Sequence, residues 1–476
     1  MSVVLPFVIN AGLNFVLGLL IAYFLGPEEF GRYAIGAAIM VFVNALFLDW
    51  LKLSAVRFYS LTSRESEPNI RATLDVLAAG ITIALSGLLV AAVLAGAEFG
   101  LPVLLIAASV GAGICAGLFD YHGAIARARF LDAAYARLII IKNVLALVLM
   151  VGGAWYFRDP GLVLIGSMLS VAAALLSVRK VLADAPLDLS QARRKLALQF
   201  MRYALPLVWA NAFYAAMPFL NRSLMAGEHG FAEAGYFSLA SDMGLRLFGT
   251  LGATLEIFLL REVVRLDETQ GRAAAEAQIA RNMVIVLMIV LPVATGLWLV
   301  LAPFEQLLVP AAYQGHFARY MAVLIPAFVA LALFQAGLNP VFLIAKKTLA
   351  ATLAALLGLA LNLAIIWFGP DRIGPMSYAY AQTAGFVLAL FFTAVLALRA
   401  CSVLPRFRDM GWVLLGNIAM VAALWPLTGK LSPLPSLLLM ASLGSIFYIG
   451  IMLALDVAGC RTALLNWRKT HKGTPS

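Results

Sequence analysis

The sequence is a succession of long apolar stretches separated by short polar connections. A helix needs about 20 apolar residues to cross the roughly 30 Å of hydrocarbon in a bilayer. Only 12% of the 476 residues are charged, whereas soluble domains carry about 25%. The chain therefore has too little polar surface to face water on every side. We predict an all-α polytopic membrane protein.

Charges and Gly or Pro breaks divide the chain into about fourteen predicted spans. They run approximately over 3–25, 33–56, 73–97, 101–122, 137–157, 160–180, 203–225, 233–258, 283–303, 318–344, 348–368, 374–398, 410–428 and 433–456. Between the eighth and ninth spans, the mixed charged and apolar stretch 261–281 predicts an amphipathic connecting helix on the membrane surface.

The basic residues predict the orientation, because cytoplasmic loops accumulate Lys and Arg. With the N-terminus inside, 26 of the 34 Lys and Arg residues fall on the cytoplasmic side and five on the other. We expect both chain termini to be cytoplasmic and the protein to lie in the inner (cytoplasmic) membrane. Contact between these basic residues and anionic lipid headgroups then explains the net charge of +10. We therefore predict no nucleic-acid partner.

A pattern near the N-terminus returns about 200 residues later. The first copy has Leu5-Pro6, Gly26, two acids, Gly31 and Tyr33, and the second has Leu205-Pro206, Gly227, Glu228, Gly235 and Tyr236. We predict a six-helix lobe over 1–182, a cytoplasmic linker over 183–202, a second six-helix lobe over 203–400, and two extra helices with a cytoplasmic tail over 401–476. Parallel repeats of this kind enclose a substrate path; chance similarity between apolar helices is the alternative.

The chain resembles the polysaccharide-repeat flippases (O-antigen and exopolysaccharide) of the multidrug/oligosaccharidyl-lipid/polysaccharide exporter superfamily. The residues that carry the resemblance are the first turn LGPEEFGRYA, the loop Leu307–Tyr313, Leu361-Asn362-Leu363, Gly369-Pro370 and Ile373-Gly374-Pro375. The chain departs from the family where a small-residue Gly-Ala-Ala run is usual and Pro375–Tyr378 stands instead.

The resemblance implies two six-helix lobes that open alternately to each side of the membrane. It further implies that they move an undecaprenyl-pyrophosphate-linked oligosaccharide to the periplasmic leaflet for O-antigen, capsule or exopolysaccharide synthesis. The implied partners are the lipid-linked oligosaccharide, anionic membrane lipids, and polysaccharide polymerase and chain-length proteins.

Ionisable residues inside spans are costly and usually face a cavity or a partner. Asp242 and Arg246 lie one helical turn apart in the eighth span, and Arg246 is about 13 residues into it, roughly 20 Å. We interpret Arg246 as a contact for pyrophosphate or an acidic sugar, because its planar guanidinium binds phosphate oxygens bidentately. Asp242 would hold the guanidinium. A structural ion pair is the alternative.

Other polar residues within spans form a weaker set of candidates. Arg222 could line an exit vestibule or extend to the headgroups, and Asp49 with Lys52 could form an entrance site or a local ion pair. Helical spacing places the following pairs on one face each, where they could contact sugar or bond between helices: Asn10 and Asn14, Gln335 and Asn339, and Tyr378 and Gln382. Asp120 and His122 could relay protons or lie at the interface.

Several protein classes lack their required motifs here. Cys115, Cys401 and Cys460 have no metal-site spacing, and there is no phosphate-binding glycine loop, so we predict no cofactor, no metal ligands, no catalytic residues and no direct use of ATP. A drug or cation antiporter and a lipid II flippase of the same superfamily remain alternatives. A membrane glycan polymerase or ligase is a remote one, since the outer loops are short.

Overall fold

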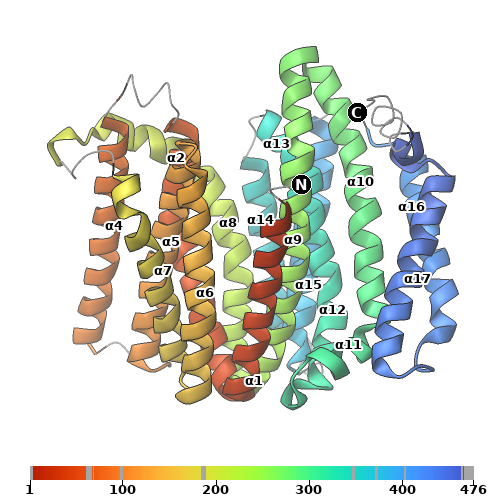
Figure 1. The fold of residues 1–476 in the computed structure, drawn as a ribbon, viewed down its shortest axis with the longest axis horizontal. Helices are drawn as coiled ribbons and strands as arrows, with labels where there is room; N and C mark the ends of the chain where they lie inside the picture. Colours follow the sequence, from red (N-terminus) through yellow and green to blue (C-terminus); the bar gives the residue numbers. More distant parts are fainter. Residues whose placement is uncertain are drawn as a thin grey trace, which may run out of the picture. The chain divides into compact units, whose positions relative to one another are not determined.

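The computed structural model describes residues 4–59, 67, 69–96, 100–183, 189–345, 349–369, 374–400, 404–462 and 465. Every long element in these ranges is a helix (Figure 1), and they contain no β-strand. Within the same ranges, 12 helices are long and apolar enough to cross a membrane, or up to 13 when one bent pair is counted as a span. The predicted all-α, polytopic membrane fold is confirmed.

The helices are numbered as in Figure 1. They are α1 (Val4–Val43), α2 (Asp49–Phe58), α4 (Asn69–Leu94), α5 (Val103–Ala128), α6 (Asp132–Tyr156), α7 (Pro160–Leu182), α8 (Arg194–His229), α9 (Phe231–Gln270), α10 (Arg272–Leu299), α11 (Leu301–Leu308), α12 (His316–Leu333), α13 (Asn339–Ala345), α14 (Leu349–Phe368), α15 (Met376–Ala400), α16 (Phe407–Leu424) and α17 (Pro433–Ala454). Two π-turns interrupt longer helices, η1 (Asn44–Leu48) between α1 and α2 and η4 (Phe334–Leu338) between α12 and α13.

The helix α1 turns sharply at Gly26. This glycine has φ 73° and ψ 171°, a conformation that residues with a Cβ rarely adopt, and Pro27 then starts the next helical segment. Gly12–Phe58 covers 47 residues, about 70 Å of helix, which is twice the thickness of the hydrocarbon. The segment therefore holds two of the predicted spans, joined at Gly26.

The turn at Gly26 recurs between α8 and α9 at Gly230, which has φ 89° and ψ 164°. Gly230 precedes Gly235 by the same number of residues as Gly26 precedes Gly31. The backbone thus makes Gly230 the counterpart of Gly26, and the predicted match of Gly26 with Gly227 is wrong. The spacing to the following glycine already favours Gly230 over Gly227 in the sequence, and the backbone conformation agrees with it.

Three helices, α8, α9 and α10, are longer than the apolar pattern predicts. α8 begins at Arg194 rather than near 203, and it bends by 52° between Arg194–Leu205 and Val208–His229. The stretch 261–281 is not a separate surface helix: α9 continues to Gln270 and α10 starts at Arg272. Charged residues such as Glu262 and Arg265, which form an ion pair three residues apart, continue a helix as readily as apolar ones.

The helices group into two compact units. The first comprises Met1–Leu239 and Ile373–Tyr378, and the second comprises Ala240–Arg372 and Ala379–Ser476. In the first unit, α5 packs against α1, α2 and α7, and α6 lies along α7. In the second, α10 packs against α12, α16 and α17, and the last two lie side by side (Figure 1, blue). The lobes predicted over 1–182 and 203–400 stay a prediction.

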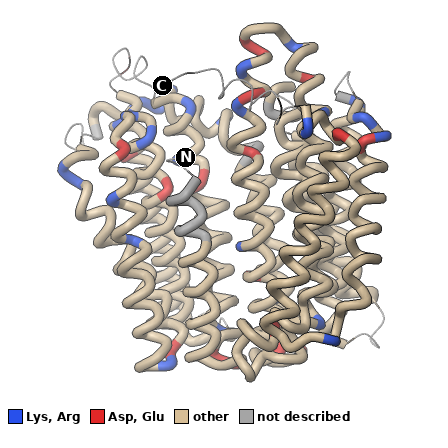
Figure 2. Tube along the Cα trace, turned by 45° about the vertical axis from the view of Figure 1, so that its right-hand side comes forward, with Lys and Arg blue, Asp and Glu red and all other residues tan. Residues whose placement is uncertain are grey.

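Charged residues are unevenly distributed along the helices. Figure 2 shows Lys, Arg, Asp and Glu mainly toward the helix ends, with long uncharged stretches between them. Because an unpaired charge in hydrocarbon is costly, the few charged residues away from the ends are the ones to consider as functional.

Candidate substrate-binding site

A polar cluster in the first unit contains the predicted pair Asp49 and Lys52. Lys52 forms an ion pair with Asp49 and lies 3.9 Å from Oδ2 of Asp120. The side-chain amide of Asn211 donates to Oδ2 of Asp49 at 3.1 Å, and that of Asn44 donates to Oδ2 of Asp120 at 3.3 Å. Side chains from η1, α2, α5 and α8 therefore meet in one network, which we call the α2 cluster.

The position of the α2 cluster depends on the π-turn η1. Asn44 is the first residue of this turn, and Asp49 follows it directly. A π-turn adds one residue to the helix and often occurs at functional sites. Asp49 is only 7% exposed, whereas the side chains of Lys52 and Asp120 are 30% and 38% exposed. The cluster therefore has a buried anchor and a partly exposed part, with one ammonium group between two carboxylates, that a hydroxylated ligand can reach.

A second polar cluster lies in the second unit, at the π-turn η4. The amide of Asn339 donates to Oε1 of Glu256 at 3.1 Å, and the side chain of Gln335 also hydrogen-bonds Glu256. The sequence placed Gln335 and Asn339 on one face, and the structure shows that both turn to the same carboxylate of α9. We call these three residues the η4 cluster.

Asp242 and Arg246 lie on the same helix as Glu256. Both side chains are half-buried on α9, one turn apart. Arg246 is far from both ends of a 40-residue helix, so its charge lies well inside the segment that crosses the membrane. A guanidinium at this depth offers several donors in a fixed plane, which suits phosphate oxygens.

Arg222 and Tyr378 are packed inside the first unit. Arg222 is 4% exposed, and its Nη1 donates to the carbonyl oxygen of Ala34 at 3.2 Å. The hydroxyl of Tyr378 donates to Oε2 of Glu228 at 2.6 Å, and the neighbouring Asn221 donates to the Tyr378 carbonyl at 3.5 Å. These contacts join the C-terminal part of α8 to α1 and to the start of α15.

The remaining predicted residues have fewer described contacts. Gln382 is fully buried in the second unit and donates to Oγ of Ser241 at 3.4 Å. Asn14 is half-buried on α1. Asn10 falls within α1, but its side chain lies outside the described residues. For Asn10 and Asn14, the contact with sugar stays a prediction.

The structure thus joins some predicted residues and adds others that the sequence did not suggest. Asp49 and Lys52 meet directly, and Gln335 and Asn339 meet through Glu256. Asn211 and Asn44 were missed, because their partners lie on other helices. The only sequence signal for them was an amide side chain within an apolar span, which hydrogen bonding between helices explains equally well.

An apolar cavity of about 460 Å³ lies in the second unit, between α10, α16 and α17. Residues along its walls include Met288, Pro292, Gly296, Met420 and Met440. Its volume is within the range of ligand pockets. A cavity with so few polar groups suits a hydrocarbon chain, and flexible methionines adapt to irregular shapes.

Metal chemistry has little support among the described residues. No three His, Cys, Asp or Glu side chains in the described part of the chain lie close enough together to hold a metal ion. Of the cysteines, Cys115 and Cys460 are described, and both are free.

Comparison with known proteins shows the fold. No protein-family model matches the chain, and no curated protein matches it by sequence. Among solved structures, the lipid II flippase MurJ in an inward closed conformation has a TM-score of 0.75 at 12% identity, covering 95% of this chain and 98% of MurJ. An inward-facing multidrug resistance MATE transporter of the MOP superfamily has a TM-score of 0.52 at 13% identity, covering 84% of this chain and 96% of the transporter.

A variant of the Vibrio cholerae MATE transporter VcmN is similar to the same degree, with a TM-score of 0.52 at 14% identity, covering 83% of this chain and 94% of VcmN. At these identities the similarity is one of architecture. The chain has the fold that MurJ and the MATE transporters of the MOP superfamily share.

Proposed function

We propose that the protein is a flippase that moves a polyprenyl-pyrophosphate-linked oligosaccharide repeat unit across the cytoplasmic membrane by alternating access. In this proposal both chain termini are cytoplasmic and the product feeds surface polysaccharide assembly, where polymerase and chain-length proteins are the expected partners. The fold supports transport across a membrane rather than enzymatic catalysis.

The observation that carries the proposal is the apolar cavity between α10, α16 and α17. A lipid-linked substrate has two parts, a charged headgroup and a hydrocarbon chain. The cavity supplies an apolar volume of about 460 Å³, in which a chain that already lies in hydrocarbon would be held by van der Waals packing. A small drug cation needs a carboxylate without a cation beside it; Asp242 has Arg246 one turn away, and Glu256 already accepts hydrogen bonds from Asn339 and Gln335.

The charged residues suit the headgroup. Arg246 lies deep in α9. Arginine binds phosphate through bidentate hydrogen bonds. We assign Arg246 to the pyrophosphate, with Asp242 holding the guanidinium, and the η4 cluster, which lies in the same unit, to the sugar hydroxyls.

A lipid II flippase is the second candidate, and the similarity to MurJ over 95% of the chain favours it. Its cargo would share the polyprenyl pyrophosphate and differ in the glycan. The two candidates therefore predict the same lipid-chain cavity and the same phosphate contact, so chemical identification of the cargo must separate them.

The test is a deletion strain in which both lipid-linked pools are quantified together with surface polysaccharide. We expect the deletion to lose the surface glycan and to accumulate the lipid-linked repeat unit. Accumulation of lipid II instead would establish the second candidate. Unchanged glycan and unchanged pools would overturn both, and drug susceptibility would then be measured.

A matched pair of variants tests the cavity itself. Gly296 lies along the cavity, and there is open space where its Cβ would be. Gly296→Phe should fill the cavity and fail to restore the glycan. Gly450→Phe on α17 is the control, because Gly450 also has open space but is exposed and outside the cavity. Equal restoration by both variants would contradict a role for the cavity.

A further inference from the structure

A second, polar cavity of about 390 Å³ lies in the first unit, at one end of α4, α5 and α7. We call it the α4 cavity. Its walls combine charged and apolar side chains: Arg71, Asp75, His122, Leu175, Leu176, Arg179, Leu182 and Ala183. Arg71 is in the first turn of α4 and Arg179 is in the last turn of α7, so the cavity opens at the level where membrane-spanning helices meet the headgroups.

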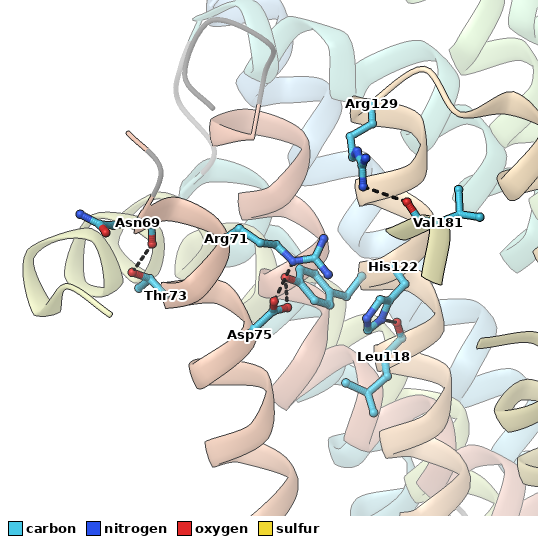
Figure 3. A network of polar contacts seen from close by, with 9 residues as sticks. Asn69, Arg71, Thr73, Asp75, Leu118, His122, Arg129 and Val181 are labelled. Atoms are coloured by element: carbon cyan, nitrogen blue, oxygen red, sulfur yellow. Dashed lines mark hydrogen bonds and ion pairs between the residues drawn. The ribbon is translucent and has the colours of Figure 1, made fainter. Parts of the chain in front are cut away.

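Asp75, the acidic residue of the α4 cavity, accepts hydrogen bonds from two protein side chains. Nε of Arg71 donates to Oδ2 of Asp75 at 2.8 Å, and the hydroxyl of Tyr121 donates to Oδ1 at 2.7 Å. The guanidinium of Arg71 also lies over the Tyr121 ring, 5.5 Å from its centre. Asp75 therefore orients the guanidinium of Arg71 (Figure 3).

Some hydrogen-bond donors in the walls of the α4 cavity are not used by these contacts. Nη1 of Arg71 is buried and makes no hydrogen bond with any described group, which is costly for a charged donor. Arg179 is exposed, and its side chain forms no ion pair among the described residues. Nδ1 of His122 donates to the carbonyl oxygen of Leu118 at 2.8 Å, so the neutral ring has no second N–H for an anion and His122 serves as part of the wall.

Other contacts hold the walls in place. Arg129, at the end of α5, donates to the carbonyl oxygen of Val181 at 3.2 Å and ties this end of α5 to the end of α7. Thr73 donates to the carbonyl oxygen of Asn69 at 2.7 Å and accepts from the backbone N–H of Arg193 at 3.1 Å. Figure 3 shows the contact of Arg129 with Val181 and that of Thr73 with Asn69. The guanidinium of Arg71, held by Asp75, is therefore positioned before any ligand arrives, which lowers the cost of binding.

We propose that the α4 cavity binds the phosphate group of an anionic phospholipid. Arg71 and Arg179 contact the phosphate oxygens. The acyl chains follow the apolar side of the site, where Leu176 is 62% exposed. The leucines can pack against the acyl chains of a lipid but contribute nothing to the binding of free phosphate, so they favour a lipid. This proposal requires only that the chain spans a membrane and does not depend on the cargo proposed above.

The experiment uses the purified full-length protein in a neutral detergent, with bound lipid counted by native mass spectrometry. The probes are dioleoyl phosphatidylglycerol, dioleoylglycerol, which has the same chains without phosphate, and inorganic phosphate as a competitor. We expect phosphatidylglycerol to be retained, dioleoylglycerol to be lost, and millimolar phosphate to compete weakly. Retention of dioleoylglycerol would reduce the site to an apolar contact, and strong competition by inorganic phosphate would make it a free-anion site. Each of these two results overturns the proposal.

Three variants localise the binding. Arg71→Gln and Arg179→Gln should each weaken phosphatidylglycerol binding about tenfold, since each removes a charge-assisted hydrogen bond. Lys180→Gln is the matched control, because Lys180 is the exposed neighbour of Arg179 and does not line the cavity. Arg71→Gln removes the partner of Asp75 and can impair folding, whereas Arg179→Gln breaks no described ion pair. Equal binding by the Arg179→Gln and Lys180→Gln proteins would overturn the assignment.

Discussion

Gly31 of α1 and Gly235 of α9 lie at a close contact between the two helices, where each glycine packs against the backbone of the other helix. A Cβ added at Gly31 would overlap the carbonyl group of Phe231, and one added at Gly235 would overlap that of Pro27. Each added Cβ would also come within 3.1 to 3.2 Å of the other glycine's nitrogen. Gly235 corresponds to Gly31, and Phe231 corresponds to Pro27, so the two contacts are equivalent. A two-fold axis between repeats produces such a pair of equivalent contacts.

This contact predicts that alanine is destabilising at either glycine. Gly31→Ala should lower stability by roughly 1–3 kcal/mol, because the helices must separate to admit the methyl group. Gly152→Ala is the control: Gly152 has open space at its Cβ, and alanine in a helix is normally favoured over glycine by roughly 0.5–1 kcal/mol. Thermal midpoints in detergent measure both. A Gly31→Ala midpoint equal to or above that of Gly152→Ala would contradict the close packing.

Tyr378 should stabilise the contact between α15 and the end of α8 through its hydroxyl. Tyr378→Phe removes the hydrogen bond to Glu228 and keeps the ring, so we expect a loss of roughly 1 kcal/mol. Tyr380→Phe is the matched control, because Tyr380 is on the same helix and 48% exposed. The comparison is again a thermal midpoint, and no difference between the two variants would exclude a stabilising role for the hydroxyl.

Arg246 should be needed for transport more than for folding. In the deletion strain, Arg246→Ala at matched membrane levels should restore surface glycan at least about tenfold less well than wild type, the loss expected for one charge-assisted contact. Arg246→Lys should be intermediate, because lysine keeps the charge without the bidentate geometry. Arg261→Ala, at an exposed position of the same helix, is the control. Full activity of Arg246→Ala would remove this residue from the site.

Asp49 and Lys52 should be coupled in stability. Asp49→Asn leaves Lys52 with only the longer contact to Asp120, and we expect a loss of roughly 1–2 kcal/mol, less than for fully buried pairs. Lys52→Met added to Asp49→Asn should recover part of that loss, because no uncompensated charge is then left. A double-mutant cycle on thermal midpoints measures the coupling. Additive effects would show that the two residues act independently.

The sequence predicted the spans because each span must be apolar along a full membrane thickness. It did not predict that α9 continues to Gln270, because that part of the helix extends past the apolar stretch and its charged residues give no hydropathy signal. Spacing within a helix identified Asp49 with Lys52, since residues three apart share a face. It could not identify Asn211, which is 162 residues from Asp49 in the chain, because contacts between helices depend on packing that local spacing does not encode.

The π-turn η1 makes the α2 cluster depend on the number of residues in the chain as well as on their identity. Each residue advances an α-helix by about 100°, and the π-turn absorbs one extra residue, so deleting one of residues 45–48 would convert the turn to regular helix and leave the faces of α2 in place. The same deletion in a regular part of α1 would rotate α2 by about 100° and turn Asp49 and Lys52 away from Asn211 and Asp120, with every side chain of the cluster still present. A one-residue deletion is therefore tolerated in the π-turn, whereas one in a regular part of α1 disassembles the α2 cluster.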